Sequence, residues 1–598
     1  MAPKALSGPP EITITSLPTA TEPAVSTATE PAVSTATEAA TNDDNYPTNT
    51  DPVHPYMGLT ENGSATFLTS GNPSLDFFFH VVPDTPASEL TRLVELSWTH
   101  DPLLTLKLIC NLRGVRGTGK SDKQGFYTAA LWLHQNHPKT ISLNMRPVSG
   151  FGYLKDMPEI LFRLLEGSDS RKRVDEVNTS YRYGVMMSRR GYKSKEEDEK
   201  KSEEEKEKAR VLRLHRKNDR TKKILERYNR DVNFQLLYDS ISDVFADLLK
   251  KDIELHQKGD LKKLGFAAKW CPTIDSTYDE VTLLCESIAR RLFPKEEHDE
   301  YKDLEEAHYA FKLYKSLFYE HDKKRFEGYL AKVESGKATI AAGALLPHEI
   351  VASLKDKDGI KVAELQWKRM VDDLAKKGKL NNCMAISDVS GSMRGTPMEV
   401  SVALGLLISE LSEEPWKGKL ITFSENPQFR TIYGATLKQK TKFIRKMDWG
   451  GSTDLQKVFD RILEVAVKGK IPEEEVIKRL FIFSDMEFNH ATGPSSWIFG
   501  ENGWEENDAV HDWGTDYMVI QRKFKESGYK RVPEIVFWNL RHSKATPVPS
   551  TQPGVALVSG FSKNLVTLFL EEGGILNPEE VMFAAVSKPE YDTLVVYD

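Results

Sequence analysis

Apolar residues recur at helical spacing through the first half of the chain. In residues 87–98, one helical face collects Leu90, Leu93, Val94 and Trp98. Asp101 and Pro102 then provide a cap and a first turn for a second helix over 103–113. Further amphipathic segments lie at 122–136, 156–166, 231–250, 278–292, 303–320 and 361–377. Because no strand pattern separates these segments, we expect a helical domain built from stacked antiparallel pairs in a curved array.

The pattern changes at residue 381, where short apolar runs alternate with amphipathic segments. The runs predict strands near 383–388, 418–423, 429–433, 479–484, 534–540 and 555–559. The amphipathic segments predict helices near 397–412, 436–447, 455–467, 513–526, 564–571 and 577–586. Such alternation is typical of a doubly wound α/β domain, in which ligands bind at the carboxyl ends of the strands.

The predicted architecture has three parts. Residues 1–72 are rich in Thr, Ala, Pro, Ser and Glu, contain the repeat Thr-Ala-Thr-Glu-Pro-Ala-Val-Ser twice in succession, and are predicted to form a disordered tail. Residues 73–380 form the predicted α-helical repeat (HEAT-like) domain, with a charged insertion at 193–230. Residues 381–598 form the α/β domain, so the chain is multidomain.

Composition limits the choice of function. The 598-residue chain has a formal net charge of -7, so binding to nucleic acid would need a local basic patch. The four cysteines form no CxxC pair and are predicted to be reduced thiols. No apolar run approaches the ~20 residues that cross a bilayer, so we expect no membrane partner. The default compartment is the cytoplasm, with the nucleus as the alternative.

Oxygen donors gather in three loops of the predicted α/β domain. Two apolar runs end at aspartates, the first is followed by two serines, and a glycine-rich loop before a helix adds a threonine. These residues are Asp388, Ser390, Ser392, Thr453 and Asp485. Two carboxylates and three hydroxyls suit Mg2+ or another hard divalent cation that keeps several waters. The sequence therefore predicts a metal site at the carboxyl edge of the sheet.

This donor set resembles the metal-ion-dependent adhesion site (MIDAS) of von Willebrand factor A domains. In that family the first loop gives an aspartate and two serines, the second a threonine and the third an aspartate. An acidic group of a partner then takes an open position on the metal. The resemblance implies that residues 381–598 form an A-like domain that binds a protein ligand through the cation.

A helical array followed by such a domain resembles the layout of Ro autoantigen (TROVE-type) proteins. The stretches at 101–114 and 150–156 look closer still to a mostly plant family of domain-of-unknown-function proteins with that architecture. In Ro proteins the helical repeats form a ring with a basic inner surface that binds small structured RNAs. The resemblance makes candidate RNA contacts of Arg113, Arg116, Lys120, Arg213, Arg216 and Arg220. The alternative for the last three is a solvated helical insertion.

Residues 114–121 match the phosphate-binding pattern GxxxxGK[ST] letter for letter. That motif acts where it follows a strand, whereas the segment before it is capped like a helix and rich in leucine. We therefore expect a basic turn between two helices, and a P-loop NTPase is the least favoured function.

These features predict a non-enzymatic, metal-dependent binding protein. Its Mg2+ site would accept an acidic group of a protein ligand, and its helical part would carry structured RNA. The alternative is a protein-protein interaction scaffold that binds no RNA.

Overall fold

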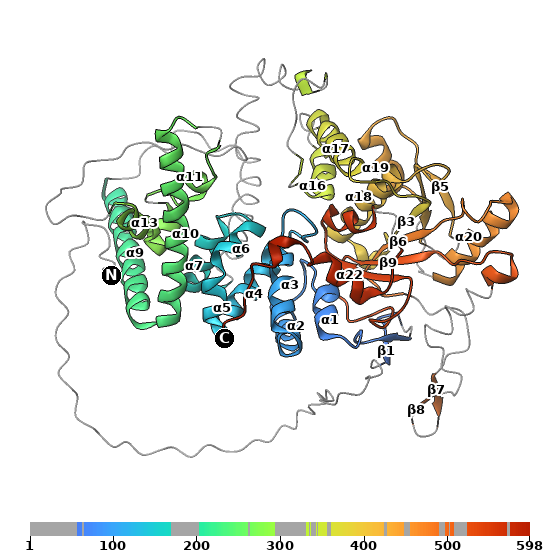
Figure 1. The fold of residues 1–598 in the computed structure, drawn as a ribbon, viewed down its shortest axis with the longest axis horizontal. Helices are drawn as coiled ribbons and strands as arrows, with labels where there is room; N and C mark the ends of the chain where they lie inside the picture. The colour runs from blue at the N-terminus through green and yellow to red at the C-terminus, as the bar shows by residue number, and fades with distance from the viewer. Residues whose placement is uncertain are drawn as a thin grey trace.

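The computed structural model describes a helical part and a part built on a six-stranded sheet, which lie side by side (Figure 1). The described residues are 57–62, 65–168, 203–260, 263–274, 276–293, 331–333, 335, 342–343, 345–355, 360–423, 427–447, 455–488, 497–500, 503–506, 523–570 and 574–598. The predicted disorder of residues 1–56 and the predicted helix at 303–320 lie outside these residues.

The helical part contains the predicted segments at 87–98, 103–113, 122–136, 156–166 and 231–250. Its helices are α1 Pro73–His80, α2 Ala87–His100, α3 Pro102–Arg113, α4 Lys123–Asn136, α5 Pro138–Leu143, α6 Met145–Phe151, α7 Asp156–Glu166, α9 Glu203–Arg230, α10 Val232–Gln257, α11 Ala267–Trp270, α12 Thr277–Thr282 and α13 Leu284–Leu292. The predicted segment 278–292 is divided at Leu283, and α1, α5, α6 and α11 were not predicted. The predicted start of α3 is confirmed, because the Asp101 side chain accepts a hydrogen bond from the amide of Leu104 and Pro102 occupies the first turn.

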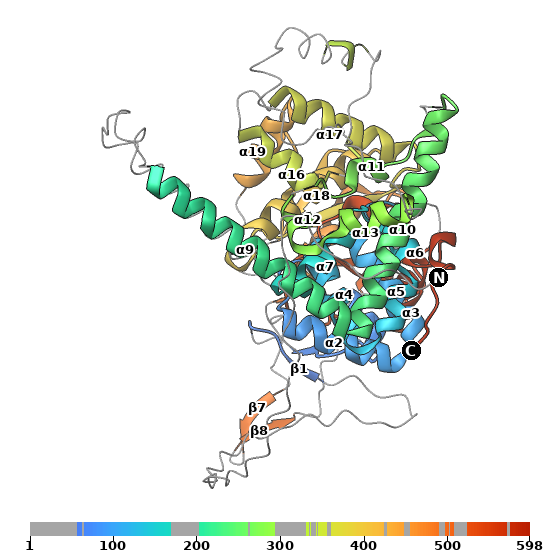
Figure 2. The ribbon, with the colours of Figure 1, turned by 90° about the vertical axis from the view of Figure 1, so that its left-hand side faces the viewer.

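The charged insertion ends in one long helix, α9, whose N-terminal end extends away from the rest of the molecule (Figure 2). Its last turns are packed, since Ile224 and Tyr228 are buried and the helix contacts α10 and α12. The Tyr228 hydroxyl donates to Asp239 of α10 at 3.0 Å. The end of the insertion therefore belongs to the core of the helical part.

Six strands form the sheet, and their positions match the predicted ones. They are β3 Cys383–Ser387, β4 Lys419–Thr422, β5 Phe429–Thr431, β6 Arg479–Ser484, β9 Glu534–Asn539 and β10 Val555–Ser559. The order across the sheet is β10-β9-β6-β3-β4-β5, with only β5 antiparallel to its neighbour. β3 and β6 are buried along their whole length, which explains their uninterrupted apolar sequence.

The described helices of this part follow the order of the prediction, with two differences, and most of the predicted helix at 513–526 lies outside the described residues. They are α18 Thr396–Leu411, α19 Leu437–Arg445, α20 Leu455–Gly469 and α22 Pro578–Ala585, with the short 3-10 turns η4 Gly391–Met393 and η6 Pro589–Tyr591. The predicted helix at 564–571 is instead a 3-10 helix, η5 Lys563–Phe569. A short hairpin, β7 Trp497–Gly500 and β8 Gly503–Glu506, was not predicted.

The helices just before the sheet pack on the helices of the α/β part. They are α16 Pro347–Ala352, the 3-10 turn η2 Ser353–Lys355 and α17 Ile360–Ala375. α16 and α17 contact α18, and the Trp367 indole donates to Glu410 at 2.8 Å. By packing, the α/β part therefore starts before the predicted boundary at residue 381.

Segments from both ends of the chain join the two parts. α1 lies against β10 and α22, and one continuous apolar core includes residues of both parts (Figure 1). Two short strands, β1 Met57–Leu59 and β2 Ala65–Phe67, lie where the sequence predicted a disordered tail, and Phe67 pairs with Thr546. The Asp598 carboxylate accepts hydrogen bonds from the amides of Lys139 and Thr140 at the start of α5.

Two global features bear on the expected compartment. None of the four cysteines is paired in a disulfide. Among the helices of the described ranges, none has both the length and the apolar character of a bilayer-spanning segment.

Candidate functional site

The sheet has a topological switch point at β3. This strand is the first of the sheet in the sequence, and the chain continues to β4 on one side and to β6 on the other. In open α/β sheets a crevice forms outside the carboxyl ends of the strands at such a point. Asp388 directly follows β3 and Asp485 directly follows β6, so parallel pairing brings the two aspartates to this crevice.

Asp388 is fully buried, and its contacts set the position of the first loop. Its Oδ1 accepts a hydrogen bond from the Ser390 amide at 2.8 Å, and its Oδ2 accepts one from the Ser484 hydroxyl at 2.8 Å. The hydroxyl oxygens of Ser390 and Ser392 lie 3.0 Å apart and are partly exposed. The first loop thus presents two hydroxyls beside a buried carboxylate.

Asp485 lies next to this loop and carries an oxygen without a partner. Its side chain is buried, and Oδ1 accepts from the Glu487 amide at 3.3 Å and from the Ser484 hydroxyl at 3.4 Å. Within the part of the chain that the structure describes, Oδ2 has no hydrogen-bond partner. Arg541 is the cation beside it, with Nη1 at 4.0 Å. A buried carboxylate oxygen in this state is costly unless a cation or water meets it.

Two adjacent buried carboxylates repel each other when both are ionised. Burial, and then the charge of Asp485, raise the pKa of the Asp388 carboxyl to about 6. A divalent cation between the carboxylates would remove this repulsion. The local electrostatics therefore favour a bound cation.

The donors fit a hard cation better than a soft one. Oxygen ligands are the preference of Mg2+ and Ca2+, whereas zinc sites use sulfur and nitrogen. Across the described ranges, no three His, Cys, Asp or Glu side chains gather at one point. A cation at the switch point would therefore be held by two carboxylates together with hydroxyls and water.

Thr453, the predicted donor of the second loop, lies outside the described residues, which omit 448–454. The helix predicted to follow it is α20. Of the five predicted metal ligands, four are described, and they lie at the same edge of the sheet: Asp388, Ser390, Ser392 and Asp485.

Two residues at this edge were not predicted. The Ser484 hydroxyl connects the two aspartates, and the Arg541 guanidinium donates to the Ser392 carbonyl oxygen at 2.8 Å. Both come from strand ends, since Ser484 ends β6 and Arg541 follows β9 by two residues. Listing every polar residue that ends or follows a predicted parallel strand would have found both.

The structure separates the predicted RNA contacts. Arg113 is buried in an ion pair with Asp156, with Nε to Oδ2 at 2.7 Å and Nη2 to Oδ1 at 3.1 Å. Lys120 is buried and donates to the Ser559 hydroxyl and to the carbonyl oxygens of Phe78 and Val81. Their prediction as RNA contacts is wrong, because neither side chain reaches the surface.

The other four candidate RNA contacts differ in their exposure and pairing. Arg116 and Arg216 are exposed, whereas Arg220 is half-buried and pairs with Glu280 at 3.1 Å. Arg213 belongs to α9, but its side chain lies outside the description.

The GxxxxGK[ST] segment forms the turn between α3 and α4, as predicted. Its backbone amides already donate to carbonyl oxygens: Gly114 to Cys110, Val115 to Phe151, Gly119 to Arg116, Lys120 to Asn111 and Ser121 to Gly114. A phosphate-binding loop needs such amides for its ligand. Gly119 is required by packing, because a Cβ there would lie 2.1 Å from the Gly114 carbonyl oxygen. The glycines of this loop thus have a structural explanation.

Comparison with known proteins gives family relationships for both parts. A family model described as a domain of unknown function (DUF2828) matches residues 60–313 and 307–380, and a second one (DUF7788) matches residues 382–593. The chain is also similar to the uncharacterised protein L728 of Acanthamoeba polyphaga mimivirus. The two are 28% identical over 576 residues, covering 88% of this chain and 85% of the viral protein.

These matches correct the family expected from the sequence. Neither the helical part nor the α/β part is matched by a Ro (TROVE) or von Willebrand factor A model; the matching models are the two domains of unknown function. The assignment to those two families was therefore wrong. Support for a metal site therefore comes from the oxygen donors at the sheet edge alone.

Proposed function

Since the chain belongs to the family described as domain of unknown function DUF2828, we propose its function from the geometry of the sheet edge. The protein is a non-enzymatic binding protein that holds Mg2+ or another hard divalent cation. Its ligands are Asp388, Ser390, Ser392 and Asp485, with Thr453 as a fifth. The cation binds an acidic group of a protein ligand.

The Oδ2 of Asp485, which accepts no hydrogen bond from a described residue, carries this proposal. It lies in a buried site beside a second carboxylate and next to a pair of serine hydroxyls. Arg541 supports the second half of the proposal. Its guanidinium is 40% exposed and lies at the mouth of the site, where it would attract an anionic group of a ligand.

A second proposal concerns the helical part. The packing of α2 with α3 and α4, and of α10 with α9 and α13, supports a HEAT-like array of stacked helices. Such an array would act as a platform beside the cation site. The ligand of this platform is structured RNA, for which Arg116 and Arg216 are the exposed candidate contacts. The alternative is a scaffold that binds proteins and no RNA.

Titration calorimetry with MgCl2 tests the cation site. Wild type should bind Mg2+, and Asp485→Asn should not. Asp460→Asn is the matched control, because Asp460 pairs with Lys523 on the exposed side of α20 and should leave Mg2+ binding unchanged. If wild type and Asp485→Asn give the same heats, the site is not a metal site.

Capture of proteins from a cell extract tests the role of the cation. Partners that need the cation should be lost from wild type with EDTA and from Asp388→Ala without it. Equal capture by wild type, by wild type with EDTA and by Asp388→Ala would refute the role of the cation in binding the protein ligand.

A further inference from the structure

A pocket of about 250 Å³ opens in the helical part, away from the sheet edge. Its walls come from the α3–α4 loop, the turn between α6 and α7, the C-terminal half of α10, and the segment that leads into α11. The residues that give it chemical character are Arg116, Tyr153, Lys251, Lys263, Phe266 and Trp270. We call this set the aromatic pocket. Nothing in the proposed cation site uses it.

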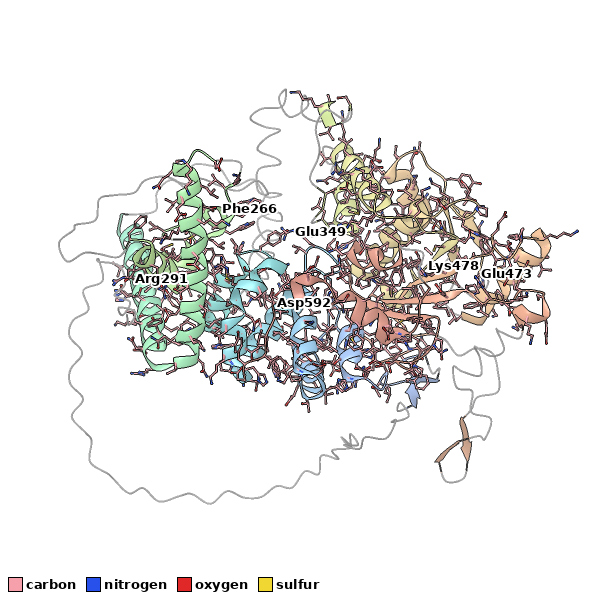
Figure 3. The ribbon with its side chains drawn as sticks, in the orientation of Figure 1. Phe266, Arg291, Glu349, Glu473, Lys478 and Asp592 are labelled. Atoms are coloured by element: carbon pink, nitrogen blue, oxygen red, sulfur yellow. The ribbon has the colours of Figure 1, made fainter. Side chains whose placement is uncertain are left out.

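Three aromatic rings line the pocket. Phe266 is 65% exposed, and Figure 3 shows it beside α10 and α11 at the edge of the helical part. The rings of Tyr153 and Trp270 lie 5.6 Å apart at an angle of 44°. Phenyl and indole faces are platforms on which flat aromatic ligands stack. The exposed Phe266 ring leaves one such platform open at the mouth of the pocket.

The charges around the rings are mostly positive. Arg116 and Lys251 are exposed and form no ion pair with a described residue, and Lys263 pairs only with Asp260 on the surface. The single acidic side chain of the lining, Asp252, is held by the Gly265 amide at 2.7 Å. With Asp252 and Asp260 counted against the three cations, one net positive charge remains at the pocket, which favours a ligand that carries negative charge.

The wall behind Tyr153 is held in place before any ligand binds. The Arg113 guanidinium lies 5.3 Å from the centre of the Tyr153 ring, and Asp156 accepts from the Tyr153 amide at 2.9 Å. Gly152 allows this close packing, because a Cβ there would lie 2.2 Å from the Asp156 carboxylate. The buried Arg113–Asp156 pair therefore fixes one platform of the pocket.

We propose that the aromatic pocket binds a nucleotide. The base stacks on the exposed ring of Phe266, with Tyr153 and Trp270 as the wall of the pocket, and the phosphate contacts Arg116, Lys251 or Lys263 at the rim. The volume is below the range of about 300–1,000 Å³ that holds drug-sized ligands, so it holds a single base. The nucleotide is either free or one unpaired nucleotide of a nucleic acid. This inference does not depend on the cation site.

Fluorescence anisotropy with a short fluorescein-labelled oligouridylate tests the proposal, with AMP and UMP as competitors. Wild type should bind the probe, and Phe266→Ala should weaken binding by about tenfold, since stacking on one side chain is worth a factor of this order. Ile274→Ala is the matched control, because Ile274 is a 71% exposed apolar residue outside the lining and should have no effect.

The charge contribution is tested in the same assay. Lys251→Gln should lower the affinity and flatten its dependence on salt concentration, since one fewer phosphate contact releases fewer counterions. Lys258→Gln should do neither. Lys258 is the exposed residue that directly follows α10, and it lies outside the pocket lining. Asp388→Ala should bind the probe as wild type does.

The competitors identify the source of the nucleotide. If AMP or UMP displaces the probe at concentrations similar to that at which the oligonucleotide saturates the protein, the natural ligand is a free nucleotide. If neither displaces it, the ligand is an unpaired nucleotide within a nucleic acid chain. Failure of wild type to bind either the oligonucleotide or a mononucleotide overturns the proposal. So does an equal affinity of Phe266→Ala and Ile274→Ala.

Discussion

The Nζ atom of Lys120 lies 2.8 Å from the hydroxyl oxygen of Ser559. The lysine belongs to the α3–α4 loop and the serine ends β10, so this contact joins the helical part to the sheet. The carbonyl oxygens of Phe78 and Val81, at the end of α1, accept from the same ammonium group. Lys120 therefore stabilises the junction of the two parts.

The stability of the protein should depend on pH through Lys120. Burial lowers the pKa of this lysine from 10.5 to about 7. Between these pH values the unfolded chain binds more protons than the folded one, so the lysine's contribution to stability grows as pH rises and is lost as pH falls towards 7. From pH 7 to pH 9, the free energy of unfolding of wild type should rise relative to Lys120→Met by about 2 kcal/mol.

Urea unfolding of both proteins at the two pH values measures this difference. Lys258→Met, at an exposed position, is the control and should show no such change relative to wild type. A difference between wild type and Lys120→Met that is the same at pH 7 and pH 9 would mean that the lysine is solvated.

Removing one charge from the cation site should have opposite effects without and with Mg2+. Asp485→Asn keeps the shape of the side chain but ends the repulsion that helps to raise the pKa of Asp388. Without divalent cations we expect the variant to be more stable than wild type by about 1 kcal/mol. With MgCl2 only wild type should gain stability, because ligand binding stabilises the state that binds it. Thermal unfolding with and without MgCl2 distinguishes this result from an equal gain in both proteins.

The buried Arg113–Asp156 pair should be far more important for stability than an exposed pair. Arg113→Met leaves the Asp156 carboxylate buried without its cation, and loss of one partner of a buried pair costs about 3–5 kcal/mol. The exposed Arg146–Asp247 pair is the control, and Arg146→Met should cost about 0–1 kcal/mol. Chemical unfolding measures both, and equal losses would contradict the burial of Arg113.

Asp598 should stabilise α5 although the two are far apart in the sequence. Its carboxylate accepts from the amides of Lys139 and Thr140, which have no partner within the first turn of a helix. Asp598→Ala should therefore cost about 0.5–2 kcal/mol, as the loss of a helix cap does. Asp592→Ala removes an exposed carboxylate of the same segment and should cost much less. Thermal unfolding that ranks the two variants in the reverse order would exclude the capping role.

Local signals were sufficient to predict the six strands of the sheet and the longer helices. Asp101 and Pro102 mark the start of α3 by chemistry that acts within one helical turn. The strands of the sheet were found because buried parallel strands have uninterrupted apolar sequences. The sequence also predicted that Asp388 and Asp485 lie at one edge of the sheet, because the carboxyl ends of parallel strands meet there.

Tertiary contacts between distant segments account for what the sequence did not predict. Arg113 and Lys120 look like surface cations, and only the positions of Asp156 and Ser559 show that they are buried. Arg541 reaches the proposed cation site because β9 neighbours β6, an order that the sequence does not encode locally. Thr453 stays a prediction.

The packing of α1 on β10 has a consequence for the synthesis of the protein. The carbonyl oxygen of Phe78 accepts a hydrogen bond from Ser559, 481 positions later in the chain. At the usual translation rate of about 5–20 residues per second, the phenylalanine-rich helix waits roughly half a minute to a minute and a half for the strand that covers it. During that interval on the ribosome the side of α1 that β10 and α22 later cover is accessible to chaperones that bind nascent chains.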